Sequence, residues 1–290
     1  MPDKSILFQS FEEHTLMWFF ISNIFAAFMG AALKILFEFL IPQKITTLKE
    51  TNEIFREYCH KLLQSAQLAN NRIDFVIRDR GCKIQFDNEM SKISFLYAIS
   101  QYFCWVRIIQ ENALNKFVKM PRRYRKFYIL FFDTHKALCS TYHLRGLTES
   151  MDIMHENGGI IPGYDINAIV DKMLADVEDN KTIIKNPIIN ISEFVDKYKQ
   201  EPSFRNLFVS IEIWITKITP TKDNFAWNRI LVFSIALKIF IKHLDKDEKS
   251  TKQMDSLYYV RFLNPSVLER IEKDLYGYRN KGIPIPFKLE

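Results

Sequence analysis

The feature that most constrains this chain is an uncharged apolar run near its start, Thr15 to Leu33. Its nineteen residues, TLMWFFISNIFAAFMGAAL, approach the ~20 residues that a helix needs to cross the hydrocarbon core of a bilayer. The apolar pattern then continues through Ile35 to Ile41. We therefore predict a single-pass transmembrane anchor over residues 15–41, preceded by a short tail, residues 1–14, and followed by a helical domain, residues 42–290.

Two other interpretations of the run need to be weighed. A signal peptide normally begins with a basic cluster, whereas Asp3, Glu12 and Glu13 precede this run, so cleavage is not expected. A water-soluble protein could instead bury the helix in its core, with Lys34 and Glu38 on the exposed side. The sequence leaves this second alternative open.

The positions of the lysines predict the orientation of the anchor. Lys4 alone precedes the run, and three lysines follow it closely: Lys34, Lys44 and Lys49. Because cytoplasmic flanks carry an excess of Lys and Arg, we expect the domain after the anchor to be cytoplasmic. The cysteines fit a reducing compartment, since no two of them form a C-x-x-C pair. They are Cys59, Cys82, Cys104 and Cys139.

Small residues inside the run suggest self-association. Ser22, Ala26 and Gly30 recur every four residues, a spacing that lets two helices approach closely in lipid. Asn23 lies on the neighbouring stripe and could form a hydrogen bond across such a contact. We expect a homo-oligomer through these four residues, although small residues are also common in membrane helices by composition alone.

The composition favours an all-α fold, a multi-helix cytoplasmic bundle behind the anchor. Hydrophobic residues make up 48% of the chain, while 290 residues contain only 8 Gly and 10 Pro. Pro42 should end or kink the anchor helix, and apolar residues every seven positions from Leu48 to Val76 predict a long amphipathic helix. Alternation around Ile73–Ile77 and residues 82–86 leaves one short β-hairpin as an alternative.

Further helices follow from apolar runs and capping residues. Helices are predicted over residues 88–116 and 225–243, and their apolar stretches, Ile93–Ile109 and Ile230–Ile241, are predicted to lie in the core. Arg107 is the one charge between Ile93 and Ile109, and Glu111 is placed to form a buried structural pair with it. Pro121 should begin a helix reaching about Leu144, and Pro202 one that reaches Ile218. The predicted caps of the later helices are Asp165, Ser192, Asp223 and Ser266.

One block resembles a group of bacterial proteins. The block comprises Tyr97, Ser100-Gln101-Tyr102-Phe103, Trp105 and Arg107-Ile108-Ile109, with a Tyr-His-Leu-Arg-Gly segment at Tyr142 to Gly146. It resembles uncharacterised bacterial proteins that have an N-terminal membrane helix and an all-helical cytoplasmic part, over about Leu33 to Glu156. No activity is established for that group, so the resemblance implies an architecture and no site residues.

Two constellations could carry chemistry. His135, Cys139 and His143 are spaced by four, as zinc ligands on one helix face would be, but three such ligands span about 12 Å of helix and cannot all reach one ion. Glu149, Asp152, His155 and Glu156 could serve a hard metal or acid–base chemistry, yet such a set is more often a solvated face. The chain has no nucleotide-binding or nucleophile-elbow motif. We therefore predict no metal and no cofactor.

A basic patch is the most usable surface feature of the sequence. Tyr124 and Tyr128 interleave its cations, which are Lys116, Lys119, Arg122, Arg123, Arg125 and Lys126. Clustered cations attract anionic lipid headgroups, and cations with aromatic rings could equally hold single-stranded RNA. A solvated helix start is the plain alternative. With a net charge of +6, the chain has only a mild preference for anionic partners.

These features together predict a membrane-anchored, non-enzymatic interaction or effector module that self-associates in the bilayer. The first alternative is a metal-dependent hydrolase or nuclease using His135, His143, Glu149 and His155. The second is a sensor of nucleic acid or anionic lipid that works through the basic patch. No small-molecule substrate is indicated by the sequence.

Overall fold

The computed structural model describes residues 4–78, 86–116, 121–174, 187–245 and 257–283, without the side chains of residues 4–16, 19–20, 39, 54, 116, 122–123 and 257–258. The chain divides into two units, Met1–Glu53 and Ile54–Glu290. Over the described ranges the secondary structure is helical, and one isolated antiparallel bridge joins Leu174 to Ile188. The all-α prediction is thus confirmed.

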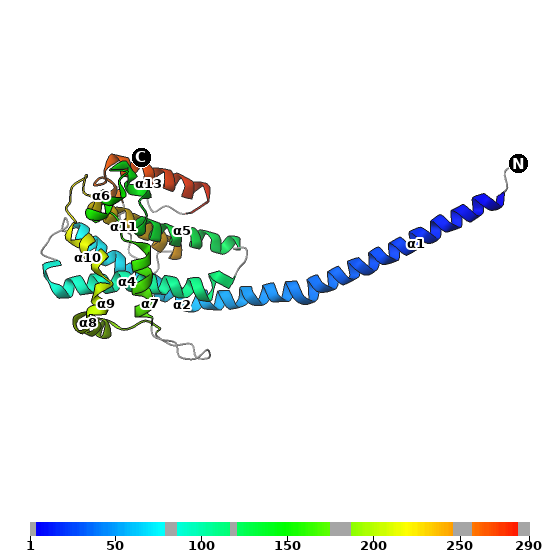
Figure 1. Cartoon of the computed structure of the whole chain (residues 1–290), viewed down its shortest axis with the longest axis horizontal. Coiled ribbons are helices and arrows are strands. Elements are labelled where there is room, and N and C mark those ends of the chain that lie inside the picture. The colour runs from blue at the N-terminus through cyan, green and yellow to red at the C-terminus, as the bar shows by residue number, and fades with distance from the viewer. Residues whose placement is uncertain (1–3, 79–85, 117–120, 175–186, 246–256, 284–290) are drawn as a thin grey trace. The chain divides into compact units, whose positions relative to one another are not determined.

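The first unit is helical throughout its described part (Figure 1). Helix α1 (Lys4–Ile35) continues through a π-helical turn, η1 (Leu36–Leu40), into helix α2 (Ile41–Arg78), and the Ile41 amide donates to the Leu36 carbonyl. Pro42 has no amide hydrogen, so it cannot donate to the carbonyl four residues before it. The wider turn accommodates this loss, and the proline shifts the helical register without ending the helix.

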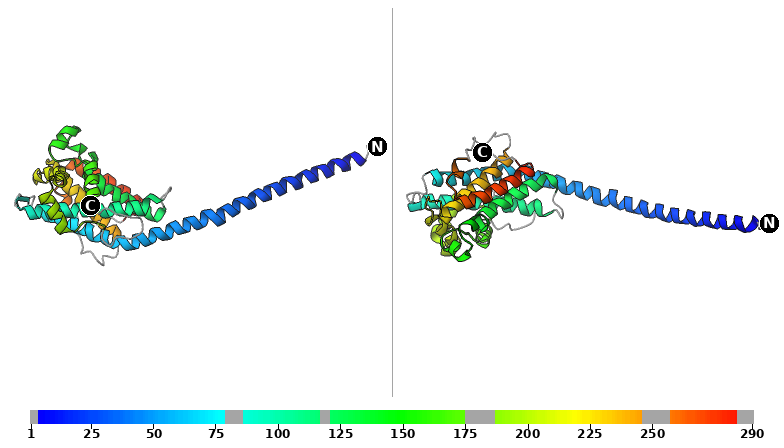
Figure 2. Two further views of the ribbon diagram at one scale, coloured as in Figure 1. Left: turned by 60° about the horizontal axis from the view of Figure 1, so that its bottom comes forward. Right: turned by 90° about the horizontal axis from the view of Figure 1, so that it is seen from above.

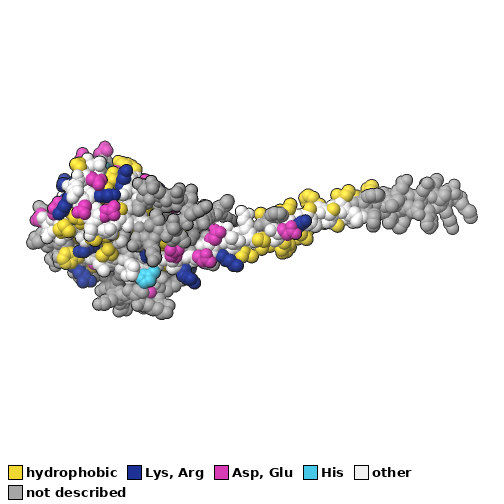
Figure 3. Space-filling model, turned by 90° about the horizontal axis from the view of Figure 1, so that it is seen from below, with side chains coloured by type: hydrophobic (Ala, Val, Ile, Leu, Met, Phe, Trp, Pro, Cys, Tyr) yellow, Lys and Arg dark blue, Asp and Glu magenta, His cyan; other side chains and the backbone are white. Residues whose placement is uncertain are grey.

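The apolar part of α1 is exposed on all sides. Every described side chain from Ile21 to Glu38 is exposed, and hydrophobic side chains cover this stretch in Figure 3. Among the described residues, one helix is long and apolar enough to cross a membrane, and none of its apolar window is buried. The core helix of a soluble protein would be mostly buried, and this helix is not.

Burial along helix α2 keeps the helical period up to the end of the helix. Ile73, Val76 and Ile77 are buried, while Phe75 between them is exposed. This pattern of one buried stripe is that of an amphipathic helix, and it continues the predicted stripe through Leu62, Ala66 and Ala69. The hairpin alternative is therefore wrong for residues 73–78. Residues 79–85 of the predicted hairpin lie outside the described part of the chain.

Two helices form the centre of the second unit, as predicted. Helix α4 (Glu89–Asn112) begins at Asn88, whose side chain accepts hydrogen bonds from the amides of Met90 and Ser91. Helix α11 (Phe225–Leu244) begins at Asn224, and 15 of its 20 residues are buried. A helix that is apolar all round must be covered on all sides, so both lie where other helices can surround them.

The remaining helices cover this centre. Helices α5 (Arg122–Cys139), α11 and α13 (Pro265–Asn280) lie side by side, while α7 (Gly163–Met173) and α8 (Ile191–Gln200) pack against α4 (Figures 1 and 2). The shorter elements are η2 (Leu114–Lys116), η3 (Tyr142–Gly146), α6 (Met151–Glu156), α9 (Pro202–Asn206), α10 (Val209–Thr216) and α12 (Leu257–Val260).

Several predicted helix ends are displaced. The caps are Pro162, Asn190, Asn224 and Asn264 where we predicted Asp165, Ser192, Asp223 and Ser266. The helix predicted to reach Leu144 ends at Cys139, and the helix predicted to reach Ile218 is broken between α9 and α10. At that break Phe208 packs edge-on against Phe194, and burying Phe208 there outweighs the continuity of the helix.

Candidate functional site

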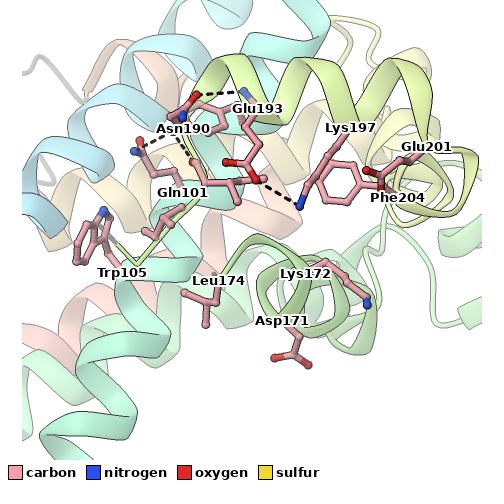
Figure 4. A pocket seen from close by; sticks show the side chains of 13 residues that line it. Gln101, Trp105, Asp171, Lys172, Leu174, Asn190, Glu193, Lys197, Glu201 and Phe204 are labelled. Atoms are coloured by element: carbon pink, nitrogen blue, oxygen red, sulfur yellow. Dashed lines mark hydrogen bonds and ion pairs between the residues drawn. The ribbon is translucent and has the colours of Figure 1, made fainter. Parts of the chain in front are cut away.

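A cleft of about 760 Å³ lies between α4, α7 and α8 (Figure 4). Its floor is one face of α4, where Tyr97, Gln101 and Trp105 follow one another at four-residue intervals. Its walls are the end of α7, the extended residues 187–190 and the α8–α9 corner. The wall residues are Asp171, Lys172, Leu174, Ile188, Ile189, Asn190, Glu193, Lys197, Glu201 and Phe204.

The floor of the cleft is held in place by hydrogen bonds and ring contacts. The Tyr97 hydroxyl donates to the Ile189 carbonyl at 3.2 Å and accepts from Gln101 Nε2 at 3.3 Å. The Trp105 ring lies 5.1 Å from Lys61 Nζ and contacts Tyr58 on α2. Burial raises the pKa of Tyr97, followed in effect by nearby Cys104, so this hydroxyl is a neutral donor at neutral pH.

The walls carry charges of both signs. Glu193 pairs with Lys197 at 3.4 Å along one turn of α8, as Figure 4 shows. Asp171 is 3.5 Å from Arg107, which also pairs with Glu111. Figure 4 shows Asp171, Glu193 and Lys197 on the walls that surround Gln101 and Trp105 of the floor. The cleft therefore suits a polar ligand or peptide that offers both donors and acceptors.

The described lining of the cleft is rich in ionisable and polar groups. It combines carboxylates, lysines and a phenol hydroxyl, which can bind a polar ligand: Asp171, Glu193, Glu201, Lys172, Lys197 and Tyr97. The sequence carries little signal for the cleft, because its floor ends at Trp105 and its walls begin only at Asp171, far along the chain. The α4 face alone looks like a buried stripe, as Tyr97 and Trp105 indeed are.

The Arg107–Glu111 pair forms, but it is not buried as predicted. The Arg107 and Glu111 side chains are 33% and 50% exposed. Such a pair is screened by water and contributes little to stability. Arg107 also pairs with Asp171, so its guanidinium bridges Glu111 and a residue that lines the cleft.

The histidines and carboxylates of the hydrolase alternative do not converge. His135 and Cys139 lie on α5, His143 lies on η3, and Glu149 and His155 are exposed near or on α6. The end of α5 at Cys139 removes His143 from the face on which we predicted it. Burial raises the pKa of Cys139 to about 12, which keeps the thiol protonated. Within the described residues no three His, Cys, Asp or Glu side chains are grouped to hold a metal ion.

His143 instead belongs to a buried polar cluster between η3, α5 and α13. Its Nε2 is 2.9 Å from Asp274 Oδ2, and the Tyr278 hydroxyl donates to Asp133 Oδ2 at 2.6 Å. Burial raises the pKa of Asp133 and lowers the pKa of His143, although the Asp274 hydrogen bond opposes the latter shift. These two contacts link α13 to η3 and to α5, so the cluster holds α13 in place.

Lowering the pH from 7.5 to 5.5 is expected to destabilise the second unit through His143. The unfolded histidine takes up a proton near its ordinary pKa of about 6.5, whereas the folded one resists it. The contribution of His143 to the free energy of unfolding is therefore complete above about pH 6.5 and declines as the pH falls below this value. Burial lowers the pKa of His135 as well, so His135 adds to the same trend. We expect His143→Gln to show a smaller drop in melting temperature between the two pH values than the wild type. An equal drop would contradict this role, and His155→Gln, on the surface of α6, is the control.

The basic patch is described only in part. Arg125 is exposed, and Lys126 Nζ donates to the Gly282 carbonyl at 2.7 Å, so one cation has a structural partner. The side chains of Lys116, Arg122 and Arg123, and all of Lys119, lie outside the described residues. Binding of lipid or RNA by this patch remains a prediction.

The small-residue stripe of α1 is free of contacts within the chain at Gly30. A Cβ atom added there meets nothing within 4 Å, and Ser22, Asn23, Ala26 and Gly30 are all exposed. The surface is thus open to a second helix, but self-association stays a prediction.

Three cysteines lie in the described residues as free thiols: Cys59, Cys104 and Cys139.

Comparison with known proteins adds no assignment. The resemblance to bacterial proteins with an N-terminal membrane helix remains a hypothesis. No protein-family model, curated protein or solved structure matches this chain.

Proposed function

We propose that this protein is a membrane-tethered binding module. The apolar part of α1 spans the bilayer, and the second unit binds a polar partner in the α4–α7–α8 cleft on the cytoplasmic side. The observation that carries the proposal is the exposure of apolar side chains all round α1. Exposing apolar surface to water costs about 25 cal/mol per Å², and this cost disappears when the apolar side chains of α1 lie in lipid.

The same exposure gives a test by substitution. Phe25 and Phe28 lie near the middle of the run and are exposed. A charged residue at the bilayer centre costs about 2.5–3.5 kcal/mol on insertion scales. We expect Phe25→Asp/Phe28→Asp to move the chain from the carbonate-washed membrane pellet to the supernatant. Ile45→Asp, placed beyond the run, should leave it in the pellet, and release of the wild type by the same wash would contradict the tether.

The binding half of the proposal depends on the cleft. Lys172 and Lys273 are both exposed lysines, but Lys172 is at the cleft and Lys273 is on α13. We expect a photo-crosslinking residue at position 172 to form a discrete adduct in cells, with no such adduct from position 273. Identical crosslinking patterns from the two positions would contradict binding in the cleft.

A further inference from the structure

We propose that an exposed stripe of α5 binds the anionic surface of the bilayer. The stripe consists of Arg125, Tyr128 and Phe132, and it is called the α5 stripe below. This inference rests on the proposed tether, which would keep the second unit next to lipid. It adds a second, weaker contact that would fix which face of the unit lies against the bilayer.

The geometry separates the α5 stripe from the packed side of the helix. Its three residues lie three and four positions apart, so they share one face. Tyr124, Phe127, Leu130, Phe131 and Leu138 cover the buried side. Phe132 is 54% exposed and Tyr128 38% exposed, and their rings stack with centroids 6.3 Å apart. The core is thus complete without this pair, which leaves a large aromatic surface in water.

The positive charge at the start of α5 disfavours the helix. The first turns of α5 contain Arg122, Arg123, Arg125 and Lys126 and no acidic residue, and Pro121 supplies no side-chain cap. Cations at a helix N-terminus repel the positive end of the helix dipole. Within the described residues Arg125 forms no ion pair. A local arrangement that disfavours the helix is typical of a functional surface, and an anionic partner would offset it.

The chemistry of the α5 stripe fits a bilayer interface. Aromatic rings such as Tyr prefer the headgroup level, where one end is apolar and the other is wet. Nearby cations are attracted to anionic headgroups. Tethering converts this binding into an intramolecular event, so even a weak contact is populated. Single-stranded RNA could use the same groups, but lipid is constantly present for a tethered chain.

Photo-crosslinking in nanodiscs tests this proposal. The full chain is reconstituted with benzoylphenylalanine at Phe132, in phosphatidylcholine alone or with 30% phosphatidylglycerol. We expect a lipid adduct at position 132 that is about fivefold or more stronger in the anionic discs. Arg125→Glu should lower the adduct by at least the same factor, while Lys273→Glu on α13 should not change it.

Other outcomes are decisive as well. A lipid adduct at position 132 that ignores both phosphatidylglycerol and Arg125→Glu would overturn the proposal, as would no lipid adduct there. So would displacement of lipid by a 20-nucleotide single-stranded RNA, which would assign the α5 stripe to nucleic acid. Benzoylphenylalanine at Phe25 separates the two proposals. A lipid adduct at position 25 without one at position 132 would overturn the proposal for the α5 stripe and leave the tether intact. If neither position formed a lipid adduct, the tether itself would be overturned.

Discussion

Replacing Arg229 with methionine is expected to lower the free energy of unfolding by at least about 3 kcal/mol. The Arg229 side chain is fully buried, and it donates hydrogen bonds to the carbonyls of Ala137, Ser140 and Gly159. Methionine would leave three buried acceptors without this donor. Burial lowers the pKa of Arg229 to about 10, yet the guanidinium stays charged at neutral pH.

The three carbonyls explain why an arginine is needed there. Those of Ala137 and Ser140 lie at the C-terminal end of α5, where a cation is favoured by the helix dipole. That of Gly159 lies in the loop after α6, which turns sharply because Gly158 has a φ of 68°. A planar guanidinium can reach all three, whereas an ammonium group is a single point of donation. Arg229→Lys is therefore expected to recover only part of the loss.

The melting temperature of the full chain in detergent measures this effect. A loss of 3 kcal/mol corresponds to about 6–12 °C in a unit of this size. Arg145→Met, at an exposed position in η3, is the matched control and should stay within about 0.5 kcal/mol of the wild type. If Arg229→Met melted together with the wild type, Arg229 would not be the clamp between α11, α5 and the glycine loop.

Replacing Asp74 with alanine is expected to cost about 3–5 kcal/mol, because it leaves a buried ammonium without its carboxylate. Lys238 Nζ is 3.0 Å from Asp74 Oδ1, and its side chain is 1% exposed. Asn70 donates to the other Asp74 oxygen at 3.1 Å, and Tyr259 lies under the ammonium group at 3.7 Å. The pair joins α2 to α11.

The double replacement distinguishes pairing from packing. Asp74→Leu/Lys238→Met removes both charges, so we expect it to be much more stable than Asp74→Ala and close to the wild type. Glu269→Ala, which breaks an exposed pair with Lys273 on α13, is expected to leave the melting temperature unchanged. A double variant as unstable as Asp74→Ala would show that the charges themselves are required.

The sequence predicted the core helices better than the polar groups between them. Apolar residues all round α4 and α11 required burial, and both helices are central. The sequence pattern predicts that Arg107 is buried, because it interrupts an apolar run, whereas the arginine found buried among the described residues is Arg229. Its partners, such as Gly159, are 70 or more residues away along the chain, and no local pattern reveals them.

Helix ends show the same division between local and distant causes. Asn190 and Ser192, like Asn264 and Ser266, can each cap a helix, and they stand two positions apart. The choice between them depends on the direction from which the chain enters the bundle. The cleft could not be predicted for a related reason, since α7, α8 and residues 187–190 meet α4 only in the folded chain.

The placement of α1 in lipid is tested most directly by Trp18. Trp18 is 69% exposed and lies about 9 Å along the helix from the middle of the run at Ile24, while Trp105, Trp214 and Trp227 are buried in the second unit. In nanodiscs made with 6,7-dibrominated lipid, we predict quenching of part of the tryptophan fluorescence, and loss of that quenching in Trp18→Phe. Equal emission of the wild-type chain in brominated and ordinary lipid would contradict a bilayer-spanning α1.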